Sequence, residues 1–130
     1  MSTSEALIFD CDGTLADTMP AHYRAWLDLL RPFEVAFPEP RFYAMGGMPT
    51  TEILRQLFQE HGKHADFVEL AKVKEAMFLE NITEVLPVEK VVAVARAALG
   101  QKPISVASGG HRSTVERTLR HLGIWDWFPV

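Results

Sequence analysis

Short apolar runs and longer segments with helical periodicity alternate along the chain. Residues 6–9 form a continuous apolar run that ends at Asp10, which is typical of a strand buried on both faces. Residues 104–107 form a second run of this kind, which ends at Ser108. The segments between the two runs are helical in pattern. Strands that are joined through helices are typical of parallel pairing, so the chain is predicted to have an α/β fold with parallel strands.

Five segments carry apolar residues at the three- and four-residue spacing of an amphipathic helix. They are expected to begin at Thr18, Thr50, Asp66, Leu86 and Ser113. The connection 31–49 contains four of the eight prolines and two adjacent glycines, which predicts an irregular segment with a short helix near residues 40–45.

Local signals mark several helix ends. Asp66 with Glu69, and Ser113 with Glu116, have the spacing of a capping box. Leu86-Pro87 is expected to open its helix, because proline is favoured in a first turn. Residues 91–95 would also suit a strand, but the length of the segment up to residue 100 favours a helix.

Composition places the chain among ordinary globular domains. It has 130 residues, 48% of them hydrophobic and 23% charged. A chain of this length can bury one hydrophobic core but is too short for two full-sized domains. The net charge of −4, with no basic run, argues against nucleic acid as a partner. No apolar run approaches the roughly 20 residues of a membrane span. One cysteine allows no internal disulfide, so a cytoplasmic location is the default expectation.

The two strand ends carry the candidate chemistry. Asp10 and Asp12 follow the first strand, where two carboxylates can hold Mg²⁺ together with substrate phosphate and water. A carboxylate can also be the nucleophile that accepts a phosphoryl group. Ser108 and the backbone N–H groups near Gly109 offer an anion site at the second strand end.

Other interpretations of these residues remain open at this stage. Asp12-Gly13 alone would suit a hairpin turn, although the residues that follow are helical in pattern. An EF-hand loop fails, since Leu15 and Ala21 stand where it requires glycine and glutamate. Ser108 and the glycines after it would also suit an ordinary loop. Cys11 is expected to be a buried, inert side chain rather than a nucleophile.

The ten residues 9–18, FDCDGTLADT, resemble the first motif of the haloacid dehalogenase superfamily, D-x-D-G-T-x-x-D-T/S. Residues 106–110 look like its second motif, a strand that ends in Ser or Thr. With residues 22–26 and Leu86-Pro87, the resemblance extends to the β-phosphoglucomutase-like subgroup. Within it, the chain looks most like phosphatases that act on fructose-1-phosphate or 6-phosphogluconate.

The resemblance implies a Mg²⁺-dependent phosphatase of small phosphorylated sugars. Asp10 would be the nucleophile, forming an aspartyl-phosphate, and a Mg²⁺ ligand. Asp12 would be the general acid and base, with its backbone carbonyl on the metal. Thr14, Ser108 and Gly109 would bind the transferring phosphoryl group. A phosphomutase is the main alternative, and a dehalogenase a weaker one.

The resemblance also implies a Rossmann-like core with an inserted helical cap. Residues 1–16 and 86–130 would form part of the core, and residues 17–85 the cap. Four cap positions match places that contact substrate in the subgroup, while surface or packing roles are the alternative for each: His22, Gly47, Thr50 and Lys74. Since the mutases carry an arginine at the position of Thr50, this residue weakens the mutase interpretation.

The family's third and fourth motifs, a lysine and an acidic pair, are absent from the chain. The C-terminal part of the core is therefore expected to be missing, and the chain alone to be inactive or impaired. A non-catalytic phosphate-binding module is the alternative. Uncovered strand edges predict self-association unless the rest of the fold is present, with Trp125, Trp127 and Phe128 near the exposed boundary, where the next strand should begin.

Overall fold

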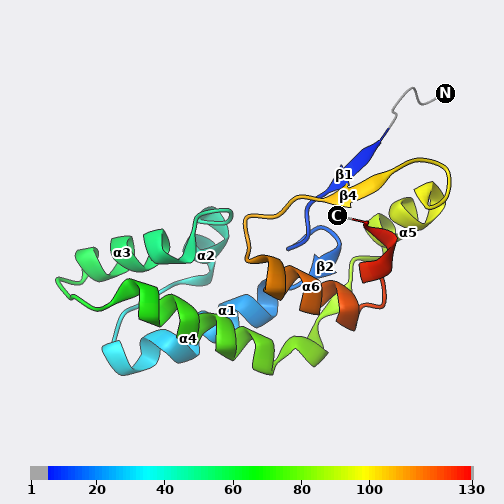
Figure 1. Ribbon diagram of the computed structural model, residues 1–130. Helices are drawn as coiled ribbons and strands as arrows, with labels where there is room; N and C mark the ends of the chain where they lie inside the picture. The colour runs from blue at the N-terminus through cyan, green and yellow to red at the C-terminus, as the bar shows by residue number, and fades with distance from the viewer. Residues whose placement is uncertain (1–5, 130) are drawn as a thin grey trace. The chain divides into compact units, whose positions relative to one another are not determined.

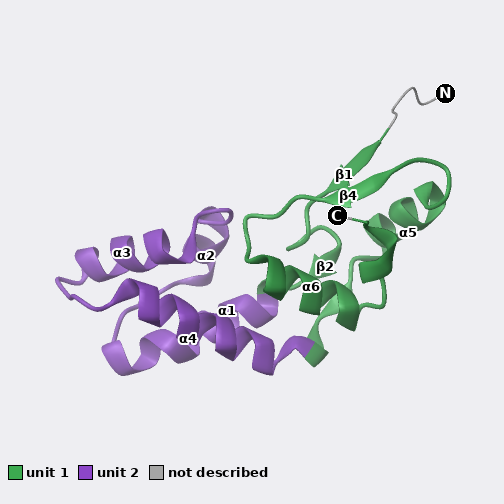
Figure 2. Ribbon diagram, viewed as in Figure 1, with its two compact units in different colours: residues 1–19, 83–130 green, residues 20–82 purple. Residues whose placement is uncertain are grey.

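The computed structural model describes residues 6–129 and divides into two compact units (Figure 2). Unit 1 comprises Met1–Met19 and Thr83–Val130, and unit 2 comprises Pro20–Ile82. The expected insertion, residues 17–85, begins and ends three residues outside unit 2. Its role as a cap stays a prediction.

Unit 1 contains two small sheets (Figure 1). Strand β1 (Leu7–Phe9) pairs in parallel with β4 (Ile104–Val106), so that Phe9 lies opposite Val106. Strand β2 (Ala16–Asp17) pairs antiparallel with β3 (Leu86–Pro87). The predicted parallel strands are therefore confirmed. Asp12-Gly13 does not form the turn of a hairpin that begins with β1, because the strand paired with β1 is β4 and not the segment after Gly13.

Two helices and a 3-10 helix complete unit 1: α5 (Glu89–Ala98), α6 (Arg112–His121) and η3 (Trp125–Trp127). The expectation that Leu86-Pro87 opens a helix is wrong, because both residues belong to β3. The Val88 N–H donates to the Leu15 carbonyl at 3.0 Å, so the helix begins only after this contact. The strand alternative for residues 91–95 is also wrong, since they lie within α5.

Two expectations near the C-terminus need correction. The N-cap of α6 is His111 and no side chain caps it, so Ser113 and Glu116 form no capping box. Residues 125–127 form a 3-10 helix rather than a new strand. Phe128 is buried, and its ring packs edge-on against Phe9 with centroids 6.2 Å apart. It is therefore a core residue and not part of an exposed boundary.

Unit 2 is helical. Its elements are α1 (Met19–Leu30), η1 (Arg31–Phe33), α2 (Glu39–Ala44), α3 (Thr50–Glu60) and α4 (Phe67–Glu80), with η2 (Ile82–Glu84) at the boundary. The N-cap expected at Asp66 is confirmed, since its side chain accepts a hydrogen bond from the Glu69 N–H at 3.2 Å, which is one half of a capping box. The short helix expected near residues 40–45 is α2.

The core of unit 2 is rich in aromatic side chains. Phe58 is fully buried, and its ring lies 5.2 Å from Phe33 and 5.5 Å from Phe67. Trp26, also buried, packs edge-on against Phe37. The two Phe58 contacts join α3 to η1 before it and to α4 after it, because Phe33 and Phe67 belong to these elements.

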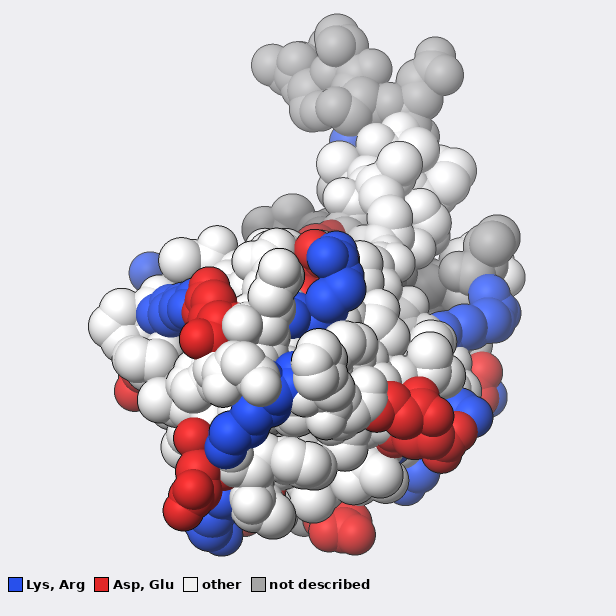
Figure 3. Space-filling view, turned by 90° about the vertical axis from the view of Figure 1, so that its left-hand side faces the viewer, with Lys and Arg blue, Asp and Glu red and all other residues white. Residues whose placement is uncertain are grey.

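The surface is mixed in charge, and on the face drawn in Figure 3 positive and negative side chains are interspersed. Within residues 6–129, no helix combines the length and the apolar character needed to cross a bilayer.

Candidate functional site

The carboxyl ends of β1 and β4 lie side by side, because the two strands are parallel neighbours. The Ala107 N–H donates to the Phe9 carbonyl at 2.9 Å, which extends the pairing to the last residue before Asp10. Asp10 and Ser108 therefore leave the sheet at the same edge. The Asp10 side chain is exposed, and its Oδ1 accepts a hydrogen bond from the Cys11 N–H at 2.8 Å.

A tight turn returns the chain after Asp10. The Cys11 carbonyl accepts hydrogen bonds from three consecutive N–H groups, those of residues 14–16, at 3.0–3.1 Å. Gly13 occupies the left-handed region with φ +75°, which a side chain would strain. These main-chain hydrogen bonds fix the conformation of the turn that contains Asp12, and so they fix the position of its backbone relative to Asp10.

Asp12 is held by a residue that the sequence analysis did not single out. The Thr18 hydroxyl donates to Asp12 Oδ1 at 2.6 Å, and Thr18 is fully buried. A charge-assisted bond of this length orients the carboxylate strongly. The threonine is the final position of the matched motif, which is the signal that would have identified it.

Ser108 and Asp12 approach the same point in space. A Cβ atom added to Gly110 would lie 3.4 Å from Ser108 Oγ and 3.9 Å from Asp12 Oδ2. Ser108 Oγ also accepts a hydrogen bond from the Gly110 N–H at 3.1 Å. The structure thus brings the serine of the second strand end next to the second aspartate of the first.

The remaining predicted phosphate contacts lie on the same two loops. Thr14 is half-buried within the turn after Asp10, and its N–H is used by the Cys11 carbonyl. Gly109 is exposed, with no atom within 4 Å of the position a Cβ would take. Neither residue has a contact that identifies a ligand, so their roles stay predictions.

Cys11 is buried between the two aspartates, as expected. Burial, followed by the negative charges of Asp12 and Asp10, raises the pKa of the thiol to about 12. The thiolate is the nucleophilic form of cysteine, and it is suppressed here. This environment agrees with an inert packing role for Cys11.

The donors at this edge fit a hard cation. Asp10 and Asp12 supply carboxylate and carbonyl oxygens, which Mg²⁺ prefers, and Mg²⁺ commonly takes its other ligands from water and substrate phosphate. Within residues 6–129, no three His, Cys, Asp or Glu side chains gather in a ready-made metal site. A cation here would thus depend on ligands beyond the aspartates.

Two of the predicted residues in unit 2 come together. Lys74 Nζ lies 2.6 Å from His22 Nδ1, although they are 52 residues apart in sequence. An ammonium group only donates, so Nδ1 is the acceptor in this contact. The His22 ring stacks on Phe78 with centroids 3.9 Å apart, and Lys74 Nζ lies 5.6 Å from the centre of the Trp26 ring. Lys74 is only 4% exposed.

The other two predicted residues of unit 2 lie at the start of α3. Gly47 has φ +88° in the turn before the helix, and Thr50 is the first helical residue. Thr50 is half-buried and does not cap the helix. The sequence singled out all four unit 2 residues, while the pairing of His22 with Lys74 emerges only from the fold.

Comparisons with known proteins agree on one family. A family model described as haloacid dehalogenase-like hydrolase matches residues 5–130. Fructose-1-phosphate phosphatase YqaB of Escherichia coli (strain K12) is 32% identical over 128 residues, which cover 95% of this chain and 66% of that protein. The 6-phosphogluconate phosphatase of the same organism is 30% identical over 134 residues, covering 99% of this chain and 58% of that protein.

A solved structure has a similar arrangement. The β-phosphoglucomutase from Clostridium difficile superposes with a TM-score of 0.78 at 26% sequence identity, over 96% of this chain and 59% of that one. The chain therefore spans less than two thirds of the length of each of these three proteins.

Proposed function

Since the chain belongs to the haloacid dehalogenase-like hydrolase family and has its mixed α/β fold with a small parallel sheet, we propose that it acts as a Mg²⁺-dependent phosphatase of small sugar phosphates. The proposal applies to this chain or to a longer protein that contains it. The observation that carries it is the meeting of Asp10, Asp12 and Ser108 at one edge of the sheet.

Asp10 is the proposed nucleophile. Its Oδ1 already accepts the Cys11 N–H, which leaves Oδ2 to attack phosphorus. A bond forms between Oδ2 and phosphorus while the bond from phosphorus to the sugar oxygen breaks, giving an aspartyl-phosphate and an alkoxide. Asp12, protonated at this stage, gives its proton to the leaving oxygen, and then accepts one from the water that hydrolyses the aspartyl-phosphate.

Neighbouring groups prepare both aspartates. Thr18 holds Asp12 Oδ1, which keeps Oδ2 directed toward the loop of Ser108 and Gly110. The Ser108 hydroxyl and the N–H groups after it are the proposed partners of the phosphoryl oxygens. Mg²⁺, held by the Asp10 carboxylate and the Asp12 carbonyl, would neutralise charge on the transferring group. Positioning and charge neutralisation are most of what phosphoryl transfer requires.

Substrate selection is assigned to unit 2, which we propose to be the cap. Its pair of half-buried His22 and buried Lys74 offers hydrogen-bond donors, and the turn with Gly47 and Thr50 offers backbone and hydroxyl groups. The two curated relatives are named for fructose-1-phosphate and 6-phosphogluconate, so a small sugar phosphate is the proposed substrate class. In family enzymes a cap excludes water and contacts the leaving group.

A substrate panel tests this proposal. Phosphate release by the protein in its full natural length is measured from fructose-1-phosphate, 6-phosphogluconate and β-glucose-1-phosphate, with Mg²⁺ and with EDTA. We expect metal-dependent turnover that Asp10→Asn lowers by about 10³-fold or more, because the nucleophile is lost. Asp126→Asn, an exposed aspartate in η3, is the matched control and should leave the rate unchanged. Turnover in EDTA, or full activity of Asp10→Asn, contradicts the proposal.

A phosphomutase is the second candidate, favoured by the structural likeness to β-phosphoglucomutase. Thr50 argues against a phosphomutase, since the mutases of the subgroup that this chain resembles carry an arginine at this position, which binds a second phosphate group. Isomerisation of β-glucose-1-phosphate in the same panel, without net phosphate release, would establish the mutase. Absence of both reactions would favour a phosphate-binding module.

A further inference from the structure

An open cleft of about 310 Å³ lies within unit 2, between α1 and α2. Four lining residues come from α1 and two from α2: Pro20, Tyr23, Arg24, Leu27, Glu39 and Tyr43. All of them belong to one compact unit. The volume is at the lower end of the range for small-molecule sites, which suits a ligand of a single ring.

One wall of the cleft is fixed before any ligand arrives. The Tyr23 hydroxyl donates to the Phe37 carbonyl at 2.8 Å, and its ring lies 5.0 Å from that of Phe42. The Tyr43 ring also packs edge-on with Phe42, with centroids 5.2 Å apart. Both tyrosine rings are therefore positioned by the buried Phe42. They form an aromatic surface on which a ligand could stack without any rearrangement of the protein.

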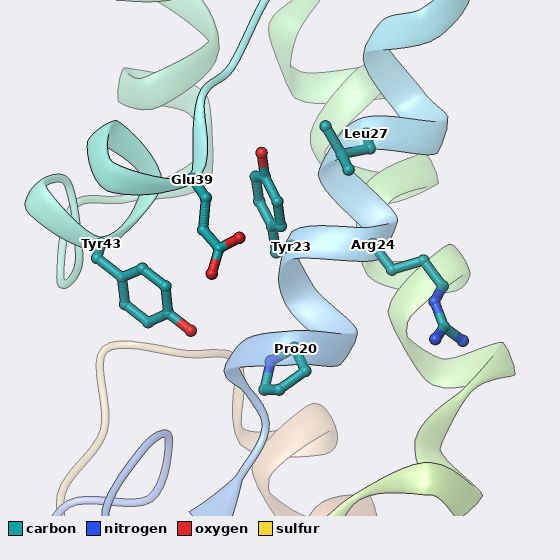
Figure 4. A pocket seen from close by; sticks show the side chains of 6 residues that line it. All are labelled: Pro20, Tyr23, Arg24, Leu27, Glu39 and Tyr43. Atoms are coloured by element: carbon teal, nitrogen blue, oxygen red, sulfur yellow. The ribbon is translucent and has the colours of Figure 1, made fainter.

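Several groups in the cleft have unused binding capacity. Leu27 is 40% exposed and Tyr43 is 51% exposed, so both leave apolar surface in water. In Figure 4 the Glu39 carboxylate lies between the two tyrosines, and the Arg24 side chain points away from it. Within the described part of the chain, neither the Glu39 carboxylate nor the Tyr43 hydroxyl has a hydrogen bond or an ion pair.

These features select a ligand class. A carboxylate without a cation beside it repels phosphate and other anions, and it accepts hydrogen bonds from hydroxyl groups. The exposed ring of Tyr43 and the side chain of Leu27 require a partner with an apolar face. A sugar has both properties, since its ring carries C–H groups on its faces and hydroxyl groups at its rim.

We propose that this cleft binds an unphosphorylated sugar, with hydroxyl groups donating to Glu39 and a C–H face stacked on Tyr43. None of its six lining residues belongs to unit 1, which contains the aspartates and Ser108. The proposal does not depend on the proposed catalytic function, because a free sugar needs no phosphoryl transfer in order to bind.

Saturation-transfer NMR on the 130-residue chain tests the site, with D-fructose and D-glucose as probes. Ethanolamine and inorganic phosphate are the cationic and anionic comparisons. We expect saturable binding of at least one sugar with a dissociation constant on the order of 1–10 mM, typical of a few weak contacts. No binding of a sugar up to about 100 mM, or preferred binding of ethanolamine or phosphate, overturns the proposal.

Variants locate the binding. Tyr43→Ala should weaken it about tenfold through loss of the stacking surface, and Tyr43→Phe by less, because the ring remains. Glu39→Gln should weaken it about fivefold, since a charged acceptor binds hydroxyl groups more strongly than an amide. Val68→Ala and Glu80→Gln, exposed residues of α4 outside the cleft, are the matched controls and should bind as the unaltered chain does.

Two further results show whether the sugar binds in this cleft and whether the cleft proposal is independent of the proposed function. Sugar binding that survives both Tyr43→Ala and Glu39→Gln, in variants with unchanged circular dichroism, refutes this site. Asp10→Asn should retain sugar binding in full. If the protein in its full natural length releases no phosphate while the sugar still binds, the proposed function is contradicted and the cleft proposal stands. The reverse pattern contradicts the cleft proposal alone.

Discussion

Thr18 and Asp12 illustrate how a single side chain can prepare a site. The threonine is fully buried, and its hydroxyl lies 2.6 Å from the Asp12 carboxylate. A buried donor directed at one oxygen restricts the rotation of the carboxylate and leaves the other oxygen available. Asp12 is therefore held in one orientation by the fold rather than by substrate.

Replacing Thr18 by valine tests this role. The change keeps shape and volume but removes the donor, so we expect a loss of about 1–2 kcal/mol in the free energy of unfolding. A misplaced acid should also lower the rate of phosphate release about tenfold. Urea denaturation and steady-state kinetics measure the two effects. Thr18→Ser, which keeps the hydroxyl, should restore most of the rate, and failure of this rescue would contradict the assignment.

Cys11 should be unreactive in the folded chain. Burial raises the pKa of its thiol from 9.0 to about 12, so at pH 8 the thiolate fraction falls about 10³-fold. We expect alkylation by iodoacetamide, in EDTA, to be at least that much slower than in the urea-unfolded chain. Rapid alkylation of the folded chain would show that the thiol is accessible.

The same shift makes stability depend on alkaline pH. Because the folded-state pKa is raised, the stabilisation from the neutral thiol is fully present below about pH 9 and is lost as pH rises toward about 12. The difference in unfolding free energy between the unaltered chain and Cys11→Ala should fall across this window. A difference that is independent of pH would contradict the burial of the thiol.

At the residue scale, sequence predicts what depends on near neighbours. The burial of Cys11 and the cap at Asp66 follow from strand alternation and from a three-residue spacing, and both are confirmed. Ser113 has the same spacing to Glu116, yet α6 begins one residue earlier, so the serine is already inside the helix. The contact of His22 with Lys74 joins positions 52 residues apart, which no local pattern encodes.

Among the elements, α3 buries four side chains, of which Phe58 is the only aromatic one. Phe58 is fully buried and touches aromatic rings before and after its helix. Phe58→Ala should cost about 3–5 kcal/mol of unfolding free energy, because it removes a large buried group and leaves a cavity. Thermal and urea denaturation followed by circular dichroism measure it. Val68→Ala, exposed on α4, should change stability by less than about 0.5 kcal/mol, and an equal loss in both variants would contradict the assignment.

The long elements were predictable and the short ones were not. Helices α1, α3 and α4 have enough periodic apolar positions to identify their type, and their observed starts lie within one residue of the expected ones. Strand β3 has only two residues, and Pro87 suggested a helix start. Its strand character depends on pairing with β2, about 70 residues earlier, which the residues of β3 themselves do not signal.

For the whole molecule, the exposed surface of the sheet has a consequence in solution. Ile8 lies in the middle of β1 and is 71% exposed, and among the described residues β1 has a single strand partner. Parallel sheets are normally covered on both faces, and open strand edges pair with other chains. The 130-residue chain is therefore expected to self-associate.

Light scattering on the 130-residue chain measures this. Ile8→Thr keeps a β-branched residue in the strand but removes apolar surface, so the variant should associate more weakly than the unaltered chain. Val94→Thr is the control, because Val94 is 53% exposed on helix α5 and offers no strand edge. A monodisperse monomer that melts cooperatively and binds no hydrophobic dye would show the expectation to be wrong.

The proposed mechanism requires that Asp10 becomes phosphorylated during turnover. The most direct measurement is acid quenching of the protein, in its full natural length, during reaction with ³²P-labelled fructose-1-phosphate and Mg²⁺, followed by peptide mapping. We expect a label on the peptide that contains Asp10, which hydroxylamine removes as it does from an acyl phosphate, and which is absent from Asp10→Asn. A label that persists in Asp10→Asn, or turnover without any labelled peptide, would contradict it.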